Sequence, residues 1–393
     1  MFSSMASLPI DPILGLMAKF REDPNSDKVD LSVGVYKTAN GHTPIFEAVK
    51  AAEKYRLETE DTKAYIGMMG TPGYNDAMLR LLIGADYPSD RIAAALTPGG
   101  CGALRVASEF LMRANPDATV WVSDPTWANH MPLIGGVGLK IKTYPYYDKA
   151  SHGVNFSGMI ETLKGLGPND VVLLHASCHN PSGADLSPAQ WDEIAAVAAE
   201  RGFIPFIDSA YQGLGEGLDA DAYGIRKIAA SVEEMILASS CSKNFGLYRD
   251  RVGQVAVMTK ADRKEVTVGQ ISSIARGMYS MPPAHGGAVV EHILTTPSLT
   301  ASWQKELAGI CSSIQTSRTL LKAGLEKAGV EGDFAYLIQN QGMFSFLDLT
   351  VEQINKLQAD YSVYLVNSGR INLAGVTANN IDYLAASIKS VTG

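Results

Sequence analysis

A lysine flanked by hydroxyl groups stands in residues 239–253, directly after an apolar run that predicts a buried strand at 235–238. Lys243 follows Ser240 and Ser242, and Arg251 comes eight residues later. A lysine at the end of a buried strand can lose its proton and attack a carbonyl carbon. Hydroxyls and a guanidinium beside it suit a phosphate. The segment predicts a lysine nucleophile at a phosphate site, with a surface loop of ordinary charges as the alternative.

A lysine imine beside a phosphate is typical of pyridoxal 5'-phosphate, and other segments carry groups that suit its ring. Asp208 follows the predicted strand 203–207, and a buried carboxylate there can keep a pyridinium nitrogen protonated. Asn180 and Tyr211 can each hydrogen-bond a phenolic oxygen on that ring. Each residue alone has an alternative interpretation without a cofactor: Asp208 as a cap of the following turn, and Asn180 as part of an ordinary turn.

Paired glycines, Gly99 and Gly100, precede Cys101 at the start of a predicted helix. Small residues there let backbone N–H groups approach a phosphate, and the helix dipole favours the anion. The turn lacks the G-x-G-x-x-G spacing of a dinucleotide loop, so by itself it is only a common loop. Trp127 suits stacking on a flat cofactor or an anchor in the core.

Two arginines suit the carboxylates of a substrate. Arg370 lies at the start of a predicted strand, and Arg276 precedes residues 279–283. The guanidinium fork matches a carboxylate in geometry and charge. Either arginine alone would usually be a surface charge.

Histidine and cysteine spacing predicts no metal. His175 and His179 are suitably spaced for ligands, but no carboxylate or cysteine completes a site, which favours a supporting role in the core. The cysteines are widely spaced, with no C-x-x-C pair, which predicts mostly buried free thiols in a reducing cytoplasm. They are Cys101, Cys178, Cys241 and Cys311.

Short apolar runs alternate with helical patterns from about residue 95 to 260, which predicts an α/β fold with a mostly parallel sheet. Ligands of such sheets bind at the carboxyl ends of the strands, so we expect the polar motifs to share one site. The predicted strands are 119–123, 171–175, 203–207, 235–238 and 254–258, and the predicted helices are 188–201 and 218–230.

The chain after about residue 300 predicts a smaller α+β domain, and a helix at about 11–20 could pack with it. We expect an N-terminal arm and part of the small domain at 1–45, a large cofactor-binding domain at 46–300, and the small C-terminal domain at 301–393. The predicted elements of the last part are a helix at 299–328, strands at 343–349 and 370–373, and a helix at 379–391.

The composition is that of a globular enzyme: of 393 residues, 46% are hydrophobic and 19% are charged. The net charge of −8 and the lack of a Lys/Arg cluster argue against a nucleic-acid partner. The sequence has no apolar run near the ~18 residues that span a bilayer. No targeting segment is evident, so we expect a cytoplasmic protein without a membrane partner.

Taken together, these residues resemble the class I, fold-type I aminotransferases, in the aspartate and aromatic amino acid subgroup. The resemblance runs nearly end to end, and it implies a large domain with a seven-stranded, mostly parallel sheet between helices, plus a small α+β domain. The segments that carry it are 31–37, 62–65, 99–100, Trp127, 179–181, 208–213, 239–253, 282–286 and 368–370.

The resemblance also implies a role for each site residue. The catalytic set is Lys243, which forms the imine and shuttles a proton, Asp208, which pairs with the ring nitrogen, and Tyr211. The cofactor-binding set adds Gly99, Gly100, Cys101, Trp127, Asn180, Ser240, Arg251 and the partner subunit's Tyr65. The substrate-binding set is Gly34, Trp127, Asn180, Arg370 and the partner subunit's Arg276, so the resemblance implies a homodimer with shared active sites.

The implied reaction is a ping-pong transamination, through aldimine and ketimine, between tyrosine, phenylalanine, tryptophan or aspartate and 2-oxoglutarate. Two departures from the family pattern bear on it. Cys101 replaces a usual Thr or Ser at the phosphate, and Met281 and Ala64 make the rim of the site more apolar. With Arg276 retained, we expect dual specificity for aromatic and dicarboxylic substrates.

Other functions stay open at this point. They are a strict aspartate aminotransferase, β-decarboxylation with the same cofactor, and a non-catalytic protein that binds the cofactor or an amino acid. Residues 240–243 also fit the S-x-x-K pattern of serine acyl enzymes, but the S-D-N and K-T-G strings that those enzymes need do not occur.

Overall fold

The computed structural model describes residues 2–7 and 12–393, which divide into two units. Unit 1 joins the residues up to Thr43 with those from Ser313 on, and unit 2 is Pro44–Ser312. The helix expected at 11–20 is α1 (Pro12–Glu22), while Asp11 lies outside the described residues. The domain boundaries expected after residues 45 and 300 stay predictions.

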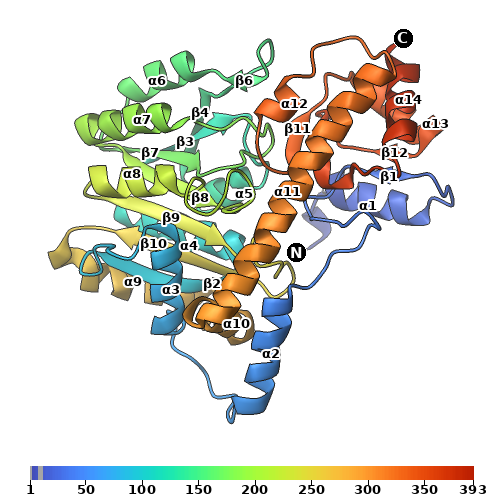
Figure 1. Cartoon of the computed structure of the whole chain (residues 1–393). Coiled ribbons are helices and arrows are strands. Elements are labelled where there is room, and N and C mark those ends of the chain that lie inside the picture. The colour runs from blue at the N-terminus through green and yellow to red at the C-terminus, as the bar shows by residue number, and fades with distance from the viewer. Residues whose placement is uncertain (1, 8–11) are drawn as a thin grey trace. The chain divides into compact units, whose positions relative to one another are not determined.

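A seven-stranded sheet forms the centre of unit 2 and confirms the predicted fold class (Figure 1). All neighbours in it pair in parallel except β10, which is antiparallel to the strand on each side. In spatial order the strands are β2 (Ile92–Pro98), β10 (Val252–Met258), β9 (Met235–Ser240), β8 (Ile204–Ser209), β7 (Asp170–His175), β3 (Thr119–Asp124) and β4 (Lys140–Pro145).

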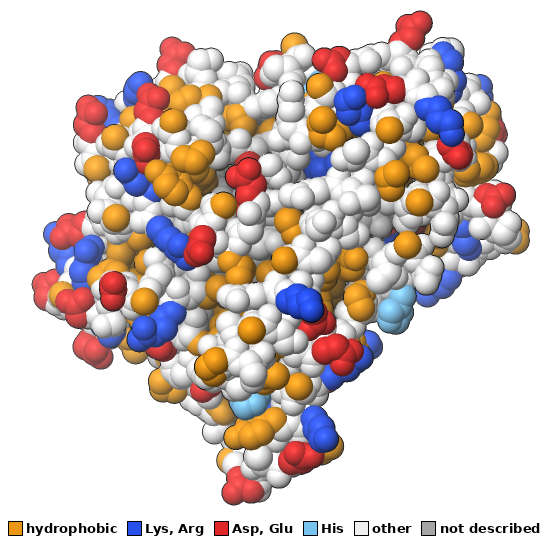
Figure 2. Space-filling model, in the orientation of Figure 1, with side chains coloured by type: hydrophobic (Ala, Val, Ile, Leu, Met, Phe, Trp, Pro, Cys, Tyr) orange, Lys and Arg blue, Asp and Glu red, His pale blue; other side chains and the backbone are white. Residues whose placement is uncertain are grey.

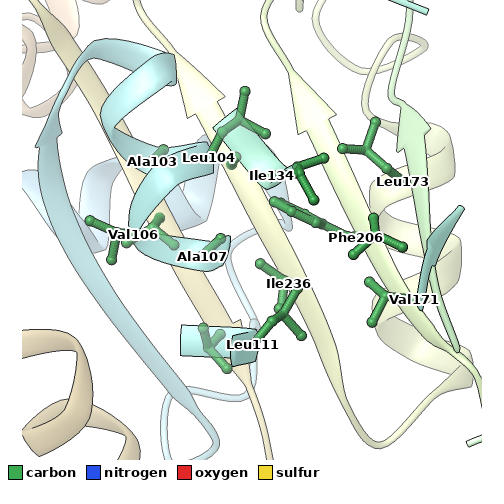
Figure 3. Packing of buried hydrophobic residues seen from close by; sticks show 14 of the residues in the cluster. Ala103, Leu104, Val106, Ala107, Leu111, Ile134, Val171, Leu173, Phe206 and Ile236 are labelled. Atoms are coloured by element: carbon green, nitrogen blue, oxygen red, sulfur yellow. The ribbon is translucent and has the colours of Figure 1, made fainter. Parts of the chain in front are cut away.

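Helices cover this sheet, and one core cluster lies between it and α4, α5 and α9 (Figure 3). Leu104 and Leu111 of α4 face Phe206 of β8 and Ile236 of β9, and all four side chains are buried. The helices of unit 2 are α2 (Glu47–Thr59), α3 (Pro72–Leu82), α4 (Gly99–Ala114), α5 (His130–Gly135), α6 (Phe156–Lys164), α7 (Pro188–Arg201), α8 (Tyr223–Ser231), α9 (Lys264–Met278) and α10 (Ala284–Thr295); α11 (Pro297–Lys327) continues into unit 1.

Local signals explain why α7 matches its prediction and α8 does not. Ser187 and Gln190 form a capping box at the start of α7, and Gly202 ends it in the left-handed region. The helix predicted to begin at residue 218 begins at Tyr223 instead. The preceding residues form turns whose backbone amides bind the carboxylate of Asp221.

Unit 1 contains strands and a final helix near the predicted 343–349, 370–373 and 379–391, together with elements that the sequence did not predict. Strand β1 (Val29–Asp30) pairs in parallel with β12 (Val363–Tyr364), and β11 (Phe344–Phe346) pairs antiparallel with β13 (Arg370–Asn372). A buried cluster that includes Leu31, Leu325 and Leu384 joins the two ends of the chain. The helices here are α12 (Tyr336–Gln339), α13 (Val351–Tyr361) and α14 (Ile381–Thr392).

Basic and acidic side chains are interspersed on the face seen in Figure 2, without a field of one sign. Among the residues that the structure describes, no helix combines the length and the apolar character that a bilayer crossing needs. Cys178, Cys241 and Cys311 are buried, as the sequence predicts for most of its cysteines.

Candidate active site

Polar residues from four neighbouring strands of unit 2 meet at one edge of the sheet. Trp127 follows β3, Asn180 follows β7, Tyr211 follows β8 and Lys243 follows β9. These strands run in parallel, so their carboxyl ends lie at the same edge, where open α/β sheets bind their ligands. The fold thus brings together groups that are far apart in the sequence.

Asp208 lies within β8 rather than after it, because it is still in register with His175 on one side and Ala238 on the other. Its buried Oδ2 accepts a hydrogen bond from His130 Nε2 at 3.0 Å. Burial raises the pKa of this carboxyl, but His130, His175 and Lys243 outweigh burial and hold the pKa below its ordinary value. Asp208 is therefore an anion inside the fold, suited to a cationic ring nitrogen.

A directed chain of hydrogen bonds runs behind Asp208. The Asn180 N–H lies 3.4 Å from His175 Nδ1, His175 Nε2 lies 3.4 Å from Thr126 Oγ1, and Thr126 Oγ1 lies 2.8 Å from His130 Nδ1. Burial is the main cause that lowers the pKa of His175 to about 3, so His175 is neutral. One assignment of donors fits every step: each group donates to the next and His130 donates to Asp208. The chain fixes the position of the carboxylate.

His179 supports the same region from the neighbouring loop. Its Nε2 lies 2.9 Å from Ser123 Oγ, its Nδ1 lies 2.8 Å from Ser182 Oγ, and its ring stacks on Tyr146 at 4.0 Å between centroids. Burial lowers the pKa of His179 well below its ordinary value. The supporting role that the sequence favoured for the two histidines agrees with these contacts.

Lys243 is half-buried beside the ring of Tyr211, with its Nζ 4.7 Å from the ring centroid. Burial is the main cause of a lowered pKa for this lysine, and the charge of Arg251 acts in the same direction. Asp208 and Cys101 oppose the shift. The amine is therefore closer to its nucleophilic, unprotonated form than a surface lysine would be.

A cradle for an anion lies at the start of α4. A Cβ on Gly99 would be 2.5 Å from Arg251 Nη2, and one on Gly100 would be 2.9 Å from Ser240 Cβ, so these groups approach only because both positions are glycine. Pro98 provides no side-chain cap, which leaves the amides of the first turn to an anion. Ser240 Oγ donates to Ser242 Oγ at 3.1 Å. Hydroxyls, a guanidinium and a helix dipole converge here.

Two predicted residues lie on the surface of unit 2. Tyr65 is 90% exposed. Arg276 is exposed at the end of α9, where its Nη1 donates to Ser280 Oγ at 2.6 Å. Both were predicted to act in the site of a second subunit.

Gly34 and Arg370 belong to unit 1. Arg370 is buried, donates to the backbone oxygen of Ser32, and has its guanidinium carbon 4.6 Å from the ring centroid of Phe344. A Cβ on Gly34 would be 2.8 Å from Phe344 Cζ, which explains the glycine. The backbone at Ser32 and the ring of Phe344 thus fix the guanidinium fork.

His130 is the supporting residue that the sequence analysis missed. It is fully buried and its ring meets that of Trp127 edge to face at 5.3 Å. Its partner Asp208 is 78 positions away in the sequence, so neither spacing nor periodicity connects the two. The only local signal is a histidine three residues after Trp127.

A lowered-pKa lysine, a buried carboxylate and an anion cradle at the carboxyl edge of an α/β sheet define a site of the pyridoxal-phosphate type. A model of the family "Aminotransferase class I and II" matches residues 26–388. The chain belongs to this family, and it is a transaminase whose cofactor is pyridoxal 5'-phosphate.

Similar proteins cover the whole length of the chain. The aromatic-amino-acid aminotransferase of Paracoccus denitrificans is 45% identical, over 97% of each chain, and the aspartate aminotransferase of Haemophilus influenzae is 44% identical, over 100% of each. The solved aromatic-amino-acid aminotransferase of Burkholderia pseudomallei, covalently bound to pyridoxal phosphate, has a TM-score of 0.97 and 40% identity, with full coverage of both chains. These likenesses confirm the predicted family and its fold-type I architecture.

Proposed function

We propose that this chain transfers the amino group of aromatic amino acids and of aspartate to 2-oxoglutarate, as a cytoplasmic homodimer. The observation that carries the proposal is the half-buried Lys243, whose amine has a lowered pKa and lies over the ring of Tyr211. Two sequence features support the substrate range: Arg276 suits a distal carboxylate, and the apolar Met281 suits an aromatic side chain. Similar proteins are named for aromatic amino acids and for aspartate.

The residues at the edge of the sheet suit the parts of the cofactor. Asp208 suits the ring nitrogen, because its carboxylate is ionised and held by His130. Asn180 and Tyr211 suit the phenolic oxygen, and Trp127 suits the face of the ring. For the phosphate we propose Gly99, Gly100, Cys101, Ser240 and Arg251 of one subunit, together with the partner subunit's Tyr65.

The bound cofactor supplies an electron sink that makes the substrate Cα–H acidic. Lys243 Nζ takes that proton and returns it, which requires an amine that is uncharged part of the time. Arg370 binds the α-carboxylate, and the partner subunit's Arg276 binds the distal carboxylate of aspartate. We assign the large cofactor-binding domain to residues 46–300, and the small domain to 1–45 and 301–393.

The test is the absorbance spectrum of the purified, cofactor-loaded protein as L-aspartate or L-tyrosine is added without an oxo acid. Conversion of the cofactor to its aminated form by both donors would support dual specificity, and conversion by aspartate alone would mean a strict aspartate enzyme. If no chromophore forms even when the cofactor is supplied, the proposal fails. Sedimentation of the same sample tests the dimer.

We expect Arg276→Ala to lower kcat/KM for L-aspartate by about 10- to 100-fold, and to change that for L-phenylalanine by less than about threefold. The reason is that only aspartate has a distal carboxylate for the guanidinium. Arg263→Ala, which removes another exposed arginine of unit 2, is the matched control and should affect neither donor. Equal losses for both donors would mean that Arg276 does not contact the distal carboxylate.

We expect Cys101→Thr to raise the affinity for pyridoxal 5'-phosphate by about 2- to 10-fold, because a hydroxyl is a stronger donor than a thiol. In the structure Cys101 Sγ instead accepts a hydrogen bond from Asn129 Nδ2 at 3.6 Å. Titration of the cofactor-free protein measures the dissociation constant. Cys101→Val has the shape of threonine without the donor and should show no gain; equal affinities for all three proteins would contradict the prediction.

A further inference from the structure

Two carboxylates that are not among the predicted site residues each accept hydrogen bonds from the backbone of a loop, and each loop carries a site residue. The loop after β8 (Ile204–Ser209) carries Tyr211 and continues through Gly213, Gly215 and Glu216. Asp221 Oδ2 accepts the amides of Gly213 and Gly215 at 2.7 and 3.0 Å, and its Oδ1 accepts the amide of Glu216 at 2.8 Å. A single buried side chain thus binds three amides of one short loop.

The same loop is closed from its other side by α11. A Cβ on Gly213 would be 2.4 Å from Leu307 Cδ2, and Gly213 has a φ of +92°, so only glycine fits there. Cys311 Sγ donates to the backbone oxygen of Gly215 at 3.2 Å. The loop after Tyr211 therefore follows the path that Asp221 and α11 define.

The loop after β7 has a comparable arrangement. Asp185 Oδ2 accepts the amide of Cys178 at 2.6 Å, and its Oδ1 accepts the amide of His179 at 2.8 Å. Cys178 has a φ of +52°, an uncommon conformation for a residue with a side chain. Asn180 follows directly after His179. This loop has a second support, since Ser123 and Ser182 also hold the ring of His179.

We infer that Asp221 is a positioning residue for Tyr211, and that Asp185 has the same role for Asn180. The inference rests on the proposed function, in which Tyr211 and Asn180 are the two partners of the cofactor's phenolic oxygen. A carboxylate can accept several N–H groups at once, whereas an amide of the same size presents an NH₂ group to at least one of them. The dependence on Asp221 should be the larger, because Asp221 binds three amides of its loop and Asp185 binds two.

Amide exchange in the cofactor-free protein tests the backbone contacts without any catalysis. Asp221→Asn should speed hydrogen–deuterium exchange in a peptide covering 213–216 by about tenfold or more, and Asp219→Asn should leave it unchanged. Asp219 is the matched control, since its exposed carboxylate pairs with Arg226 on the surface at 2.9 Å. Unchanged exchange in Asp221→Asn would overturn the inference.

A double-mutant cycle on the loaded protein tests whether Asp221 acts through Tyr211. Asp221→Asn should raise the pH midpoint of the cofactor's absorbance change by about one unit, and should add nothing in a Tyr211→Phe background. Asp185→Asn should shift the pH midpoint by less than Asp221→Asn does. Because Asp185 acts on Asn180, its shift should be the same in the wild-type and Tyr211→Phe backgrounds. Independent shifts of Asp221→Asn and Tyr211→Phe would overturn the positioning role.

A third variant keeps the test decisive if Asp221→Asn does not fold. A Cβ on Gly215 would be 2.7 Å from Asp221 Oδ1, so Gly215→Ala displaces the carboxylate without removing it. It should reproduce both the faster exchange and the shifted midpoint, and wild-type behaviour would contradict the inference. Failure of the proposed function would appear differently, as no chromophore in the wild-type protein while the amide exchange still responds to Asp221.

Discussion

Lys243→Ala should lower kcat for transamination by at least about 10⁴-fold while the protein still binds pyridoxal 5'-phosphate. The variant loses the amine that lies beside Tyr211 with a lowered pKa. The anion cradle at the start of α4 and Arg251 does not involve the lysine side chain, which is why we expect binding to persist. Steady-state kinetics with aspartate and tyrosine, and an absorbance spectrum of the dialysed variant, measure the two effects.

Two controls separate chemistry from folding in this experiment. Lys243→Arg keeps a cation at the position but cannot give up its proton at neutral pH, so it should be as inactive as the alanine variant. Lys227→Ala removes a surface lysine that pairs with Asp192 and should keep full activity. Wild-type-like turnover of Lys243→Ala would refute the assignment of the catalytic amine.

Asp208→Asn should lower kcat by roughly 10²- to 10⁴-fold, the equivalent of breaking a buried charge pair of about 3–5 kcal/mol. The wild-type carboxylate is ionised because His130 and the neighbouring charges outweigh its burial. An asparagine keeps the size of the side chain but cannot stabilise a proton on the ring nitrogen. Single-turnover kinetics with L-aspartate measure the loss in the proton-transfer step.

The matched comparison for Asp208 is its supporting histidine. His130→Gln leaves the carboxylate in place while it removes the imidazole from the hydrogen-bond chain, so we expect a loss smaller by about tenfold or more than that of Asp208→Asn. Asp208→Glu restores the charge at a slightly different place and should recover part of the rate. If Asp208→Asn has wild-type kinetics, the carboxylate has no part in the reaction.

The sequence predicted the strands that carry the site, because each is a short, continuous apolar run with a polar motif at its end. It also placed Lys243 next to hydroxyls within one local segment. It did not reveal β4 (Lys140–Pro145), since an edge strand that is largely exposed contains lysines rather than an apolar run. Nor did it reveal β2 (Ile92–Pro98), whose three consecutive alanines have little preference for strands.

The supporting contacts were beyond sequence reasoning for a physical reason. The hydrogen-bond chain behind Asp208 joins side chains from three segments. Its contacts between Thr126 and His175 and between His130 and Asp208 depend on how the strands are ordered in the sheet. The hydrogen bonds of Asp221 are to backbone amides of the loop. Almost every residue type has such an amide, so the sequence does not indicate which amides Asp221 binds. Residues whose chemistry is unusual for their local setting, such as Lys243, are the ones that the local sequence pattern itself indicates.

The division of unit 1 between the two ends of the chain sets an order for protein synthesis. Strand β1 needs β12 as its partner, and Tyr364 Oη donates to Asp23 Oδ2 across 341 positions of the sequence. A growing chain can complete unit 2 while β1 still has an open edge, because domains fold as their residues emerge from the ribosome. Chains that stop before residue 363 would lack the partner of β1 and would leave its edge unpaired, which is a site for association with other chains.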